Sequence, residues 1–214
     1  MDSSAHRLER PGVQGWLHQP DSAPVAALAL THGAGSNCCA PLLVAVAEVF
    51  AGLGYCVLRY DLPYRQARST GQPRVGASER DREGIREAAA ALRETAPGVP
   101  LYLAGHSYGG RQSTILAAED ASVADGLLLL SYPLHPPRQT VSLRTQHFAS
   151  LRVPCLFVHG TRDPFGSIDE LEAATAQIPA RHETKAVQGA VHGLPPTAAA
   201  SIAEWFHEFA RPQA

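Results

Sequence analysis

The stretch LYLAGHSYGG, residues 101–110, decides how the rest of the chain is interpreted. It opens with four apolar residues that are typical of a buried strand, and residues 111–118 after it have the composition of a helix. Between the two lies GHSYG (105–109), a Gly-x-Ser-x-Gly motif set between strand and helix. A turn this tight leaves no room for a Cβ at either glycine. The motif therefore predicts a strained Ser107 with its hydroxyl held at the end of the strand.

Length and composition favour one globular unit. The 214 residues, of which 45% are apolar and 18% charged, fit a single domain over residues 1–214 and argue against disorder. A formal net charge of −2 gives no electrostatic reason to expect nucleic acid or an anionic membrane as a partner. The opening MDSSAHRLERPG has no apolar core, so it is not expected to be a secretory signal, and no apolar run approaches the roughly 20 residues of a membrane span.

The four cysteines do not have the pattern of a disulfide framework. Cys56 and Cys155 lie in strand-like apolar runs, which indicates core packing. Cys38 and Cys39 are adjacent and could not bridge each other without strain. Neither pair has the spacing of zinc ligands, so no metal is expected. Reduced thiols together with the missing signal favour a cytoplasmic protein.

Strand-like and helix-like segments alternate along the chain. The predicted strands are 13–17 (an edge strand after a flexible start), 26–30, 55–60, 101–104, 126–131, 154–159 and 183–187. The predicted helices lie near 42–53, 78–94, 111–118, 168–176 and 202–209, with loops at 66–77 and 189–196 and an irregular segment at 132–152. This alternation predicts an α/β fold, a mostly parallel doubly wound sheet with helices on both faces.

Three predicted strands end in residues that can take part in catalysis. These residues are His32–Gly35, Ser107 and Asp163. Ligand sites in parallel sheets lie at the carboxyl ends of the strands, so we expect these three places to meet. A serine hydroxyl needs a base at pH 7, a histidine can be that base, and a carboxylate behind the histidine fixes its tautomer. The chain supplies Ser107, Asp163 and His192 in that order, with His192 in a glycine-containing loop.

An oxyanion hole is expected from two backbone N–H groups. One is the N–H of Tyr108, which follows the nucleophile and begins the helix whose positive end faces it. The second comes from the loop at residues 32–35, where we favour Ala34 over Gly33. Glycines in this loop would let the backbone approach the substrate oxygen.

Plainer interpretations exist for each of these residues. Asp163 precedes a proline and could be only a turn residue. His192 has nine rival histidines; His159 lies inside a strand and is expected to be structural, while His32 and His106 are expected to support the two loops beside the serine. Cys38 and Cys39 are expected to be packing or loop residues rather than nucleophiles.

At these residues the sequence resembles the α/β-hydrolase superfamily. More narrowly, it resembles the small dienelactone-hydrolase-like proteins grouped with testis-expressed and NSL-complex subunit 3 relatives. The matching segments are THGAGSN (31–37), RYDLPYRQ (59–66), GHSYGGR (105–111), LSYPLHPP (130–137), PCLFVHGTRDPFG (154–166) and the His192-Gly193 loop. The resemblance implies the triad Ser107, Asp163 and His192, and it implies no cofactor.

The sequence departs from that family in two ways. Residues 132–152 are too few for the helical cap that many relatives insert there, so a minimal or absent cap and an open site are expected. Dienelactone hydrolase proper uses a cysteine nucleophile, whereas this chain has Ser107. Some relatives of the narrower group are scaffold proteins.

The favoured function is a serine hydrolase that cleaves a small-molecule carboxylic ester or thioester through an acyl-enzyme. The alternative is a non-catalytic protein-interaction module that retains the fold, and a third reading is a peptidase or acyltransferase on the same triad. Arg111, Tyr132 and Phe165 neighbour the predicted site in sequence and are candidate substrate contacts. An arginine there could hold an acidic acyl group, or it could equally be solvated or hold the loops. The sequence does not indicate an oligomeric state.

Overall fold

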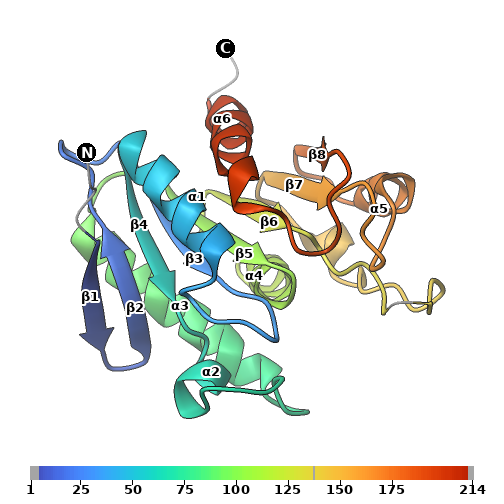
Figure 1. The fold of residues 1–214 in the computed structure, drawn as a ribbon, viewed down its shortest axis with the longest axis horizontal. Coiled ribbons are helices and arrows are strands. Elements are labelled where there is room, and N and C mark those ends of the chain that lie inside the picture. The colour runs from blue at the N-terminus through green and yellow to red at the C-terminus, as the bar shows by residue number, and fades with distance from the viewer. Residues whose placement is uncertain (1–4, 137, 212–214) are drawn as a thin grey trace.

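The central sheet determines where every other part of the chain lies. The structure is a computed structural model that describes residues 5–136 and 138–211. Within these residues eight strands form one sheet, in the order β1-β2-β4-β3-β5-β6-β7-β8 (Figure 1). Strands β3 to β8 pair in parallel, whereas β1 and β2 are antiparallel to their neighbours. The strands are β1 Ala5–Arg10, β2 Val13–His18, β3 Ala26–Thr31, β4 Tyr55–Tyr60, β5 Leu101–His106, β6 Gly126–Leu130, β7 Cys155–Gly160 and β8 His182–Val187.

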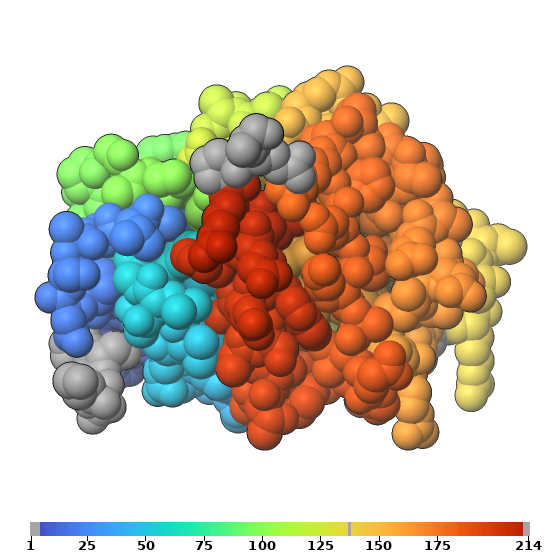
Figure 2. All heavy atoms as spheres, turned by 90° about the horizontal axis from the view of Figure 1, so that it is seen from above, coloured from blue at the N-terminus to red at the C-terminus, as the bar shows by residue number. Residues whose placement is uncertain are grey.

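Helices cover both faces of this sheet, as predicted. The helices are α1 Pro41–Gly52, α2 Pro63–Ala67, α3 Ser78–Thr95, α4 Tyr108–Glu119, α5 Ile168–Thr175 and α6 Ala199–Ala210. One apolar layer joins Phe50 of α1 and Phe206 of α6 to the sheet, and the other joins Ile85 of α3, Leu116 of α4 and Leu171 of α5 to the opposite face. Figure 1 shows α1 in front of the sheet and α3 behind it, and Figure 2 shows α6 running beside α1 on the outer surface. Strands β3, β4, β6 and β7 are buried along their whole length, which explains their mainly apolar sequences; Arg59 in β4 and His159 in β7 are buried polar exceptions.

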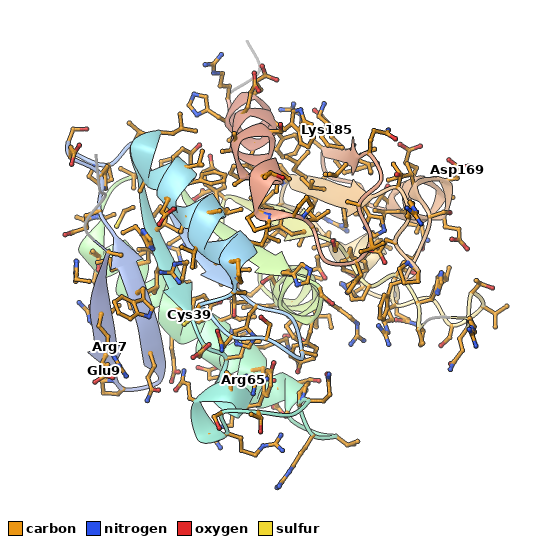
Figure 3. The ribbon with its side chains drawn as sticks, in the orientation of Figure 1. Arg7, Glu9, Cys39, Arg65, Asp169 and Lys185 are labelled. Atoms are coloured by element: carbon orange, nitrogen blue, oxygen red, sulfur yellow. The ribbon has the colours of Figure 1, made fainter. Side chains whose placement is uncertain are left out.

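The edge of the sheet differs from the prediction. Residues 13–17 were expected at the edge after a flexible start, but β1 pairs along the full length of β2 and takes the edge position. A tight turn at Pro11–Gly12, in which Gly12 has φ 76°, joins the two strands. The sequence of β1, AHRLER, is polar on both faces, so it has no apolar alternation to reveal a strand. Arg7 and Glu9 form an ion pair of 2.6 Å on it (Figure 3), and such charges discourage pairing with another chain.

Two connecting segments shape the site. The predicted loop at 66–77 begins within α2, a short helix that starts at Pro63 and buries the side chains of Tyr64 and Arg65. Between β6 and β7, the described residues 131–136 and 138–154 hold only the short 3-10 helix Phe148–Ser150 and no helical cap. None of the helices in the part of the chain that the structure describes has the length and apolar character to cross a membrane.

Candidate active site

Ser107 occupies a strained turn between β5 and α4. Its φ of 50° and ψ of −113° lie outside the ordinary regions for a residue with a side chain. A Cβ at Gly105 would lie 2.3 Å from the nitrogen of Gly110, and one at Gly109 would lie 2.6 Å from Cγ2 of Thr31. Gly109 is also close to the backbone, since the same Cβ would lie 2.7 Å from the carbonyl oxygen of His32. The two glycines are therefore required by these close contacts, as predicted from the motif. The N–H of Ser107 donates to the carbonyl of Leu130, which fixes the turn against β6.

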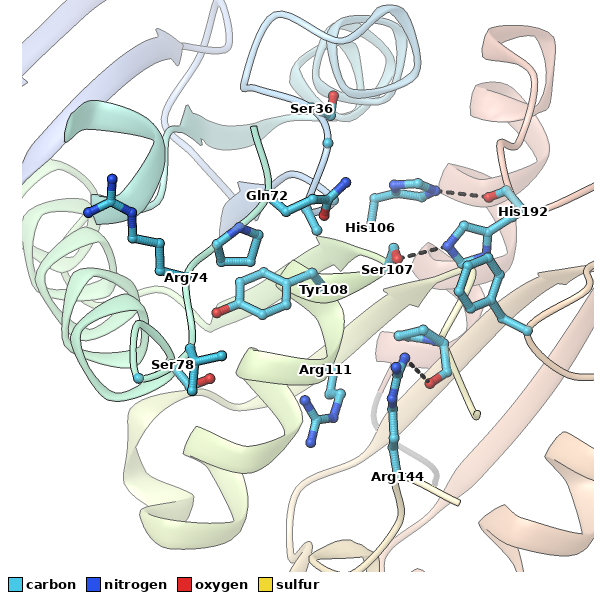
Figure 4. A pocket seen from close by; sticks show the side chains of 18 residues that line it. Ser36, Gln72, Arg74, Ser78, His106, Ser107, Tyr108, Arg111, Arg144 and His192 are labelled. Carbon is cyan, nitrogen blue, oxygen red and sulfur yellow. Dashed lines mark hydrogen bonds between the residues drawn. The ribbon is translucent and has the colours of Figure 1, made fainter. Parts of the chain in front are cut away.

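The structure brings Ser107, His192 and Asp163 together. Oγ of Ser107 lies 2.7 Å from Nε2 of His192, and Nδ1 of His192 lies 2.8 and 3.1 Å from the two carboxylate oxygens of Asp163 (Figure 4 shows the Ser107–His192 contact). These residues follow β5, β8 and β7 in the sheet, at its carboxyl edge. The Asp163 side chain is fully buried, whereas about a fifth of His192 is exposed. With Nδ1–H donating to the carboxylate, Nε2 is free to accept the serine proton.

Asp163 is held by its own turn and by the strand before it. The backbone N–H of Phe165 donates to Oδ1 of Asp163 at 2.8 Å, and Nε2 of the buried His159 lies 3.6 Å from Oδ2. His159 Nε2–H donates to the carbonyl of Gly166, and burial lowers the pKa of this histidine. A Cβ at Gly160 would lie 2.4 Å from the carbonyl oxygen of Ala190. The glycine therefore lets the loop after β8, which carries His192 and is called the histidine loop below, pack closely against the end of β7. His159 has the structural place expected of it.

His192 is held from two further sides. The ring of Phe165 stacks on its imidazole with centroids 4.0 Å apart and planes at 30°. His106 Nε2–H donates to the main-chain carbonyl of His192 at 3.0 Å. Burial lowers the pKa of His106, so its ring is neutral and carries a single proton. Since Nε2 uses that proton, Nδ1 has none, and a Cβ at Gly33 would lie only 2.9 Å from it. His106 therefore supports both neighbouring loops, as expected.

The loop at residues 32–35 runs directly beside the serine. A Cβ built on Gly33 would lie 3.4 Å from Cβ of Ser107. The N–H of Leu62 donates to Nε2 of His32, so the ring proton of His32 is on Nδ1 and donates to the carbonyl of Gly33. Tyr64 donates its hydroxyl to the carbonyls of Gly33 and Ala34 at 3.1 and 2.9 Å. In a trans peptide the N–H points away from the preceding carbonyl, so these bonds also fix the direction of the Ala34 N–H.

Tyr108 has a support that the sequence did not reveal. Its hydroxyl donates to Oδ2 of Asp81 at 2.7 Å, and the N–H of Tyr64 donates to the other carboxylate oxygen. Asp81 is fully buried in the first turn of α3, and burial raises its pKa. An acidic residue at the start of a helix is usually exposed there, so the sequence gave no reason to place it under the nucleophile turn.

A cavity of about 840 Å³ opens in front of Ser107 (Figure 4). The predicted residues Gly33, Ala34, Tyr108, Arg111 and Phe165 line it together with Ser107 and His192. Residues 72–76 of the loop before α3 and Ser78 at the start of α3 form one wall, which we call the 72–78 wall, and Pro133 and Arg144 contribute from the segment after β6. Neither this wall nor Arg144 was predicted, because both lie in irregular segments without periodicity.

Tyr132 does not line this cavity, and its prediction as a substrate contact is wrong. Its ring is fully buried against Phe148 and Phe157, with centroid distances of 5.3 and 5.8 Å. Its hydroxyl donates to the main-chain carbonyl of Arg144 at 2.6 Å. Its position just after β6 in the sequence does place the Tyr132 backbone near the site. The apolar ring, however, points into the core instead of the cavity.

Comparisons with known proteins agree with this architecture. A monoglyceride lipase from Mus musculus is 29% identical over 117 residues, which are 53% of this chain and 37% of that protein. The chain thus matches little more than a third of the length of this relative. TT1662 from Thermus thermophilus has 24% identity and a TM-score of 0.73 over 100% of both chains. A dienelactone hydrolase from Anabaena variabilis has 21% identity and a TM-score of 0.75, over 98% of this chain and 99% of that one.

The two solved structures establish the likeness of fold, whereas membership of a family rests on sequence. Residues 24–207 match the family model described as an alpha/beta hydrolase domain, which covers most of the chain. Membership and the lipase relative together support hydrolase activity in general terms. The chain belongs to the alpha/beta hydrolase domain family.

Proposed function

We propose that the protein is a serine hydrolase that cleaves carboxylic esters or thioesters, with Ser107 as nucleophile, His192 as general base and acid, and Asp163 as the carboxylate that orients His192. The observation that carries this proposal is the 2.7 Å contact between Oγ of Ser107 and Nε2 of His192 at the wall of an accessible cavity. A serine that is merely structural has no need of a strained backbone, a base and a buried carboxylate in line.

The first half-reaction forms an acyl-enzyme. Oγ of Ser107 attacks the carbonyl carbon while its proton passes to Nε2 of His192. The oxyanion that results is stabilised by the N–H of Tyr108 and by an N–H of the 32–35 loop, for which Ala34 is our first choice and Gly33 the second. The imidazolium, stabilised by Asp163, then gives its proton to the departing alkoxide or thiolate as the bond from the carbonyl carbon breaks.

The second half-reaction returns the enzyme to its starting state. A water molecule takes the place of the leaving group, gives a proton to Nε2 of His192 and attacks the acyl carbon. Collapse of the second oxyanion breaks the bond to Ser107, whose oxygen recovers the proton from His192. The products are a carboxylic acid and an alcohol or thiol, and no step requires a cofactor.

Labelling with a fluorophosphonate probe tests this assignment. The probe forms a bond from phosphorus to an activated serine oxygen and releases fluoride, so we expect one label on Ser107 and none on Ser107→Ala. Ser36 also lines the cavity, and none of the hydrogen bonds among the described residues joins its hydroxyl to a base, so Ser36→Ala is the matched control and is expected to label like the wild type. Folded protein that takes no label at Ser107 would contradict the proposal and favour the non-catalytic interaction module.

The substrate class is tested by a panel of short esters, thioesters and amides. Turnover of esters and thioesters but not amides is the expected result, because an amine is a poorer leaving group than an alkoxide or thiolate. Faster turnover of amides would favour a peptidase, and transfer of the acyl group to added alcohols rather than to water would favour an acyltransferase.

We also propose a narrower kinship and a place in the cell. The segments YPLHPP (132–137) and TRDPFG (161–166) support kinship with the dienelactone-hydrolase-like group of testis-expressed and NSL-complex subunit 3 relatives. Four free cysteines, three of them buried, support a reducing compartment and hence the cytoplasm. A small-molecule substrate, and neither nucleic acid nor membrane, is the partner proposed.

A further inference from the structure

The charge of the cavity is of one sign. Three arginines line it, Arg74, Arg111 and Arg144, and no aspartate or glutamate stands among the described residues of its wall. This contrasts with the chain as a whole, in which 20 acidic residues outnumber 18 basic ones. A concave wall that carries cations alone concentrates a positive potential and attracts anions.

Arg111, on α4, and Arg144, in the segment after β6, lack carboxylate partners. Within residues 5–136 and 138–211, neither Arg111 nor Arg144 forms an ion pair, whereas Arg82 and Arg181 lie 3.3 and 2.7 Å from glutamate oxygens. Nε of Arg111 is buried without a hydrogen-bond partner. The guanidinium of Arg144 donates only at 3.4 Å, to the carbonyl of Pro133. Most of the donors of these two groups are therefore free for a ligand.

Bringing these two cations together is unfavourable in the empty cavity. Burial and the neighbouring charge of Arg111 lower the pKa of Arg144. The nearby His147 does not relieve the repulsion, and burial lowers its pKa to about 4, so it is neutral at pH 7. A bound anion would compensate both guanidinium charges at once.

The backbone of Arg144 is nevertheless held firmly. Its N–H donates to the carbonyl of Leu134 at 2.8 Å, and its carbonyl accepts the hydroxyl of the buried Tyr132 at 2.6 Å. Both bonds fix the arginine within an otherwise irregular segment. Figure 4 shows its side chain reaching toward Ser107 and His192, while Arg111 extends from α4 below. The backbone bonds fix the point from which the Arg144 side chain starts, and from there the side chain faces the space in front of the serine.

We propose that Arg144, assisted by Arg111, binds an anionic oxygen group of the substrate, so that the preferred esters or thioesters carry a carboxylate or a phosphate in addition to the reacting carbonyl. Tyr132 acts as a positioning residue for Arg144. The inference rests on the proposed serine hydrolase function, because it names the substrate class of the same cavity. A guanidinium binds either anion through paired N–H donors, and the experiment separates the two.

Two pairs of esters test the preference. Monoethyl glutarate is compared with ethyl glutaramate, its neutral isostere, for a carboxylate on the acyl side. For a phosphate on the alcohol side, 2-acetoxyethyl phosphate is compared with 2-acetoxyethanol. In at least one pair we expect kcat/KM for the charged ester to exceed that for the neutral ester by about tenfold or more. Hydrolysis of both neutral esters with no preference for either charged one would overturn this inference and leave the hydrolase function intact.

Substitution of Arg144 identifies the group responsible. For Arg144→Gln, the ratio of kcat/KM for the charged ester to kcat/KM for the neutral ester is expected to fall by about ten- to a hundredfold. Arg144→Lys should recover part of this ratio, because lysine keeps the positive charge but lacks the paired N–H donors of the guanidinium. Arg152 belongs to the same segment, is exposed and lies outside the cavity, so Arg152→Gln is the matched control and keeps the ratio. An unchanged ratio in Arg144→Gln would contradict the assignment.

Binding to Ser107→Ala protein separates this inference from the function. Calorimetry with monoethyl glutarate and with 2-acetoxyethyl phosphate measures anion binding without turnover. We expect one of them to bind, and binding to weaken by about tenfold or more when Arg144→Gln is added. If Ser107 takes no fluorophosphonate and no ester is cleaved, the hydrolase function fails, and this titration alone decides whether the anion site exists. Absence of binding by both compounds would overturn the site.

Discussion

The imidazole of His106 donates a hydrogen bond to the main-chain carbonyl of His192, 3.0 Å away, so the residue before the nucleophile holds the loop that carries the base. The two ring centroids are 5.5 Å apart. Movement of either loop therefore changes the Ser107–His192 distance, and proton transfer depends steeply on that distance.

Replacement of His106 by alanine tests this link. We expect His106→Ala to lower kcat by about tenfold or more while KM changes little, because substrate contacts remain but the base loses its anchor. His182→Gln is the control, since His182 also bonds a backbone carbonyl, that of Ala180, but lies away from the cavity. Equal kcat in His106→Ala and wild type, with both folded, would show that the bond has no positioning role.

Asp163→Asn tests the carboxylate. An amide in this place can present an N–H to Nδ1 and so favour the tautomer with the proton on Nε2, which cannot accept the serine proton. We expect kcat to fall by about a thousandfold or more with little change in the thermal unfolding midpoint. Asp169→Asn, on the exposed first turn of α5 (Figure 3), is the control expected to retain activity. A fall in kcat of less than tenfold in Asp163→Asn would contradict the role of this carboxylate.

Gly160→Ala tests the close approach of the histidine loop to β7. The new methyl group would lie 2.4 Å from the carbonyl of Ala190, so the loop must move. We expect the free energy of unfolding to fall by about 1–3 kcal/mol and kcat to fall as well. Gly52→Ala, in α1 with open space around it, is expected to stabilise by about 0.5–1 kcal/mol. Chemical denaturation measures the free energy of unfolding of both variants, and a kinetic assay measures kcat. Full activity in Gly160→Ala would be inconsistent with this contact.

Buried histidines predict acid sensitivity. Burial and the charge of Arg59 lower the pKa of His18 to about 4, and its Nε2 accepts a hydrogen bond from Arg59. Below its ordinary pKa of about 6.5, His18 of the unfolded chain binds a proton that the folded protein does not. Stability is therefore complete above about pH 6.5 and is lost as the pH falls toward 4, by up to about 1.4 kcal/mol per pH unit for one such histidine. His147, whose pKa is also lowered to about 4, adds to this loss.

Denaturation at several pH values checks this expectation. His18→Gln keeps an acceptor for Arg59 but cannot titrate, so the dependence of the free energy of unfolding on pH between 4 and 6.5 should become shallower. The same dependence in the variant as in the wild type would show that His18 does not contribute.

Local steric rules made the nucleophile turn and the triad predictable. Glycine is needed at 105 because of contacts with Gly109 and Gly110 in the same turn, whereas Gly109 lies against Thr31 and His32 at the end of β3. The Gly-x-Ser-x-Gly motif nevertheless carries both requirements, and the triad order follows from where the strands end. The parallel strands were predictable because burial on both faces requires continuous apolar runs, as in β3 and β6.

The remaining features depend on contacts between segments distant in sequence. Strand β1 owes its place to pairing with β2 rather than to an apolar pattern. Tyr132 turned into the core because Phe148 and Phe157 lie there, and neither is near it in sequence. Arg144 and the 72–78 wall lie in irregular segments, whose paths are set by such long-range contacts.

The most direct test of the account is the identity of the atom that becomes acylated. Wild-type protein is mixed rapidly with p-nitrophenyl acetate, quenched in acid, and examined by mass spectrometry of the intact chain and its peptides. We expect one acetyl group, on Ser107, formed together with the burst of p-nitrophenolate and absent from Ser107→Ala. Hydrolysis that persists unchanged in Ser107→Ala, or an acetyl group on a different residue, would contradict the assignment of Ser107 as the nucleophile.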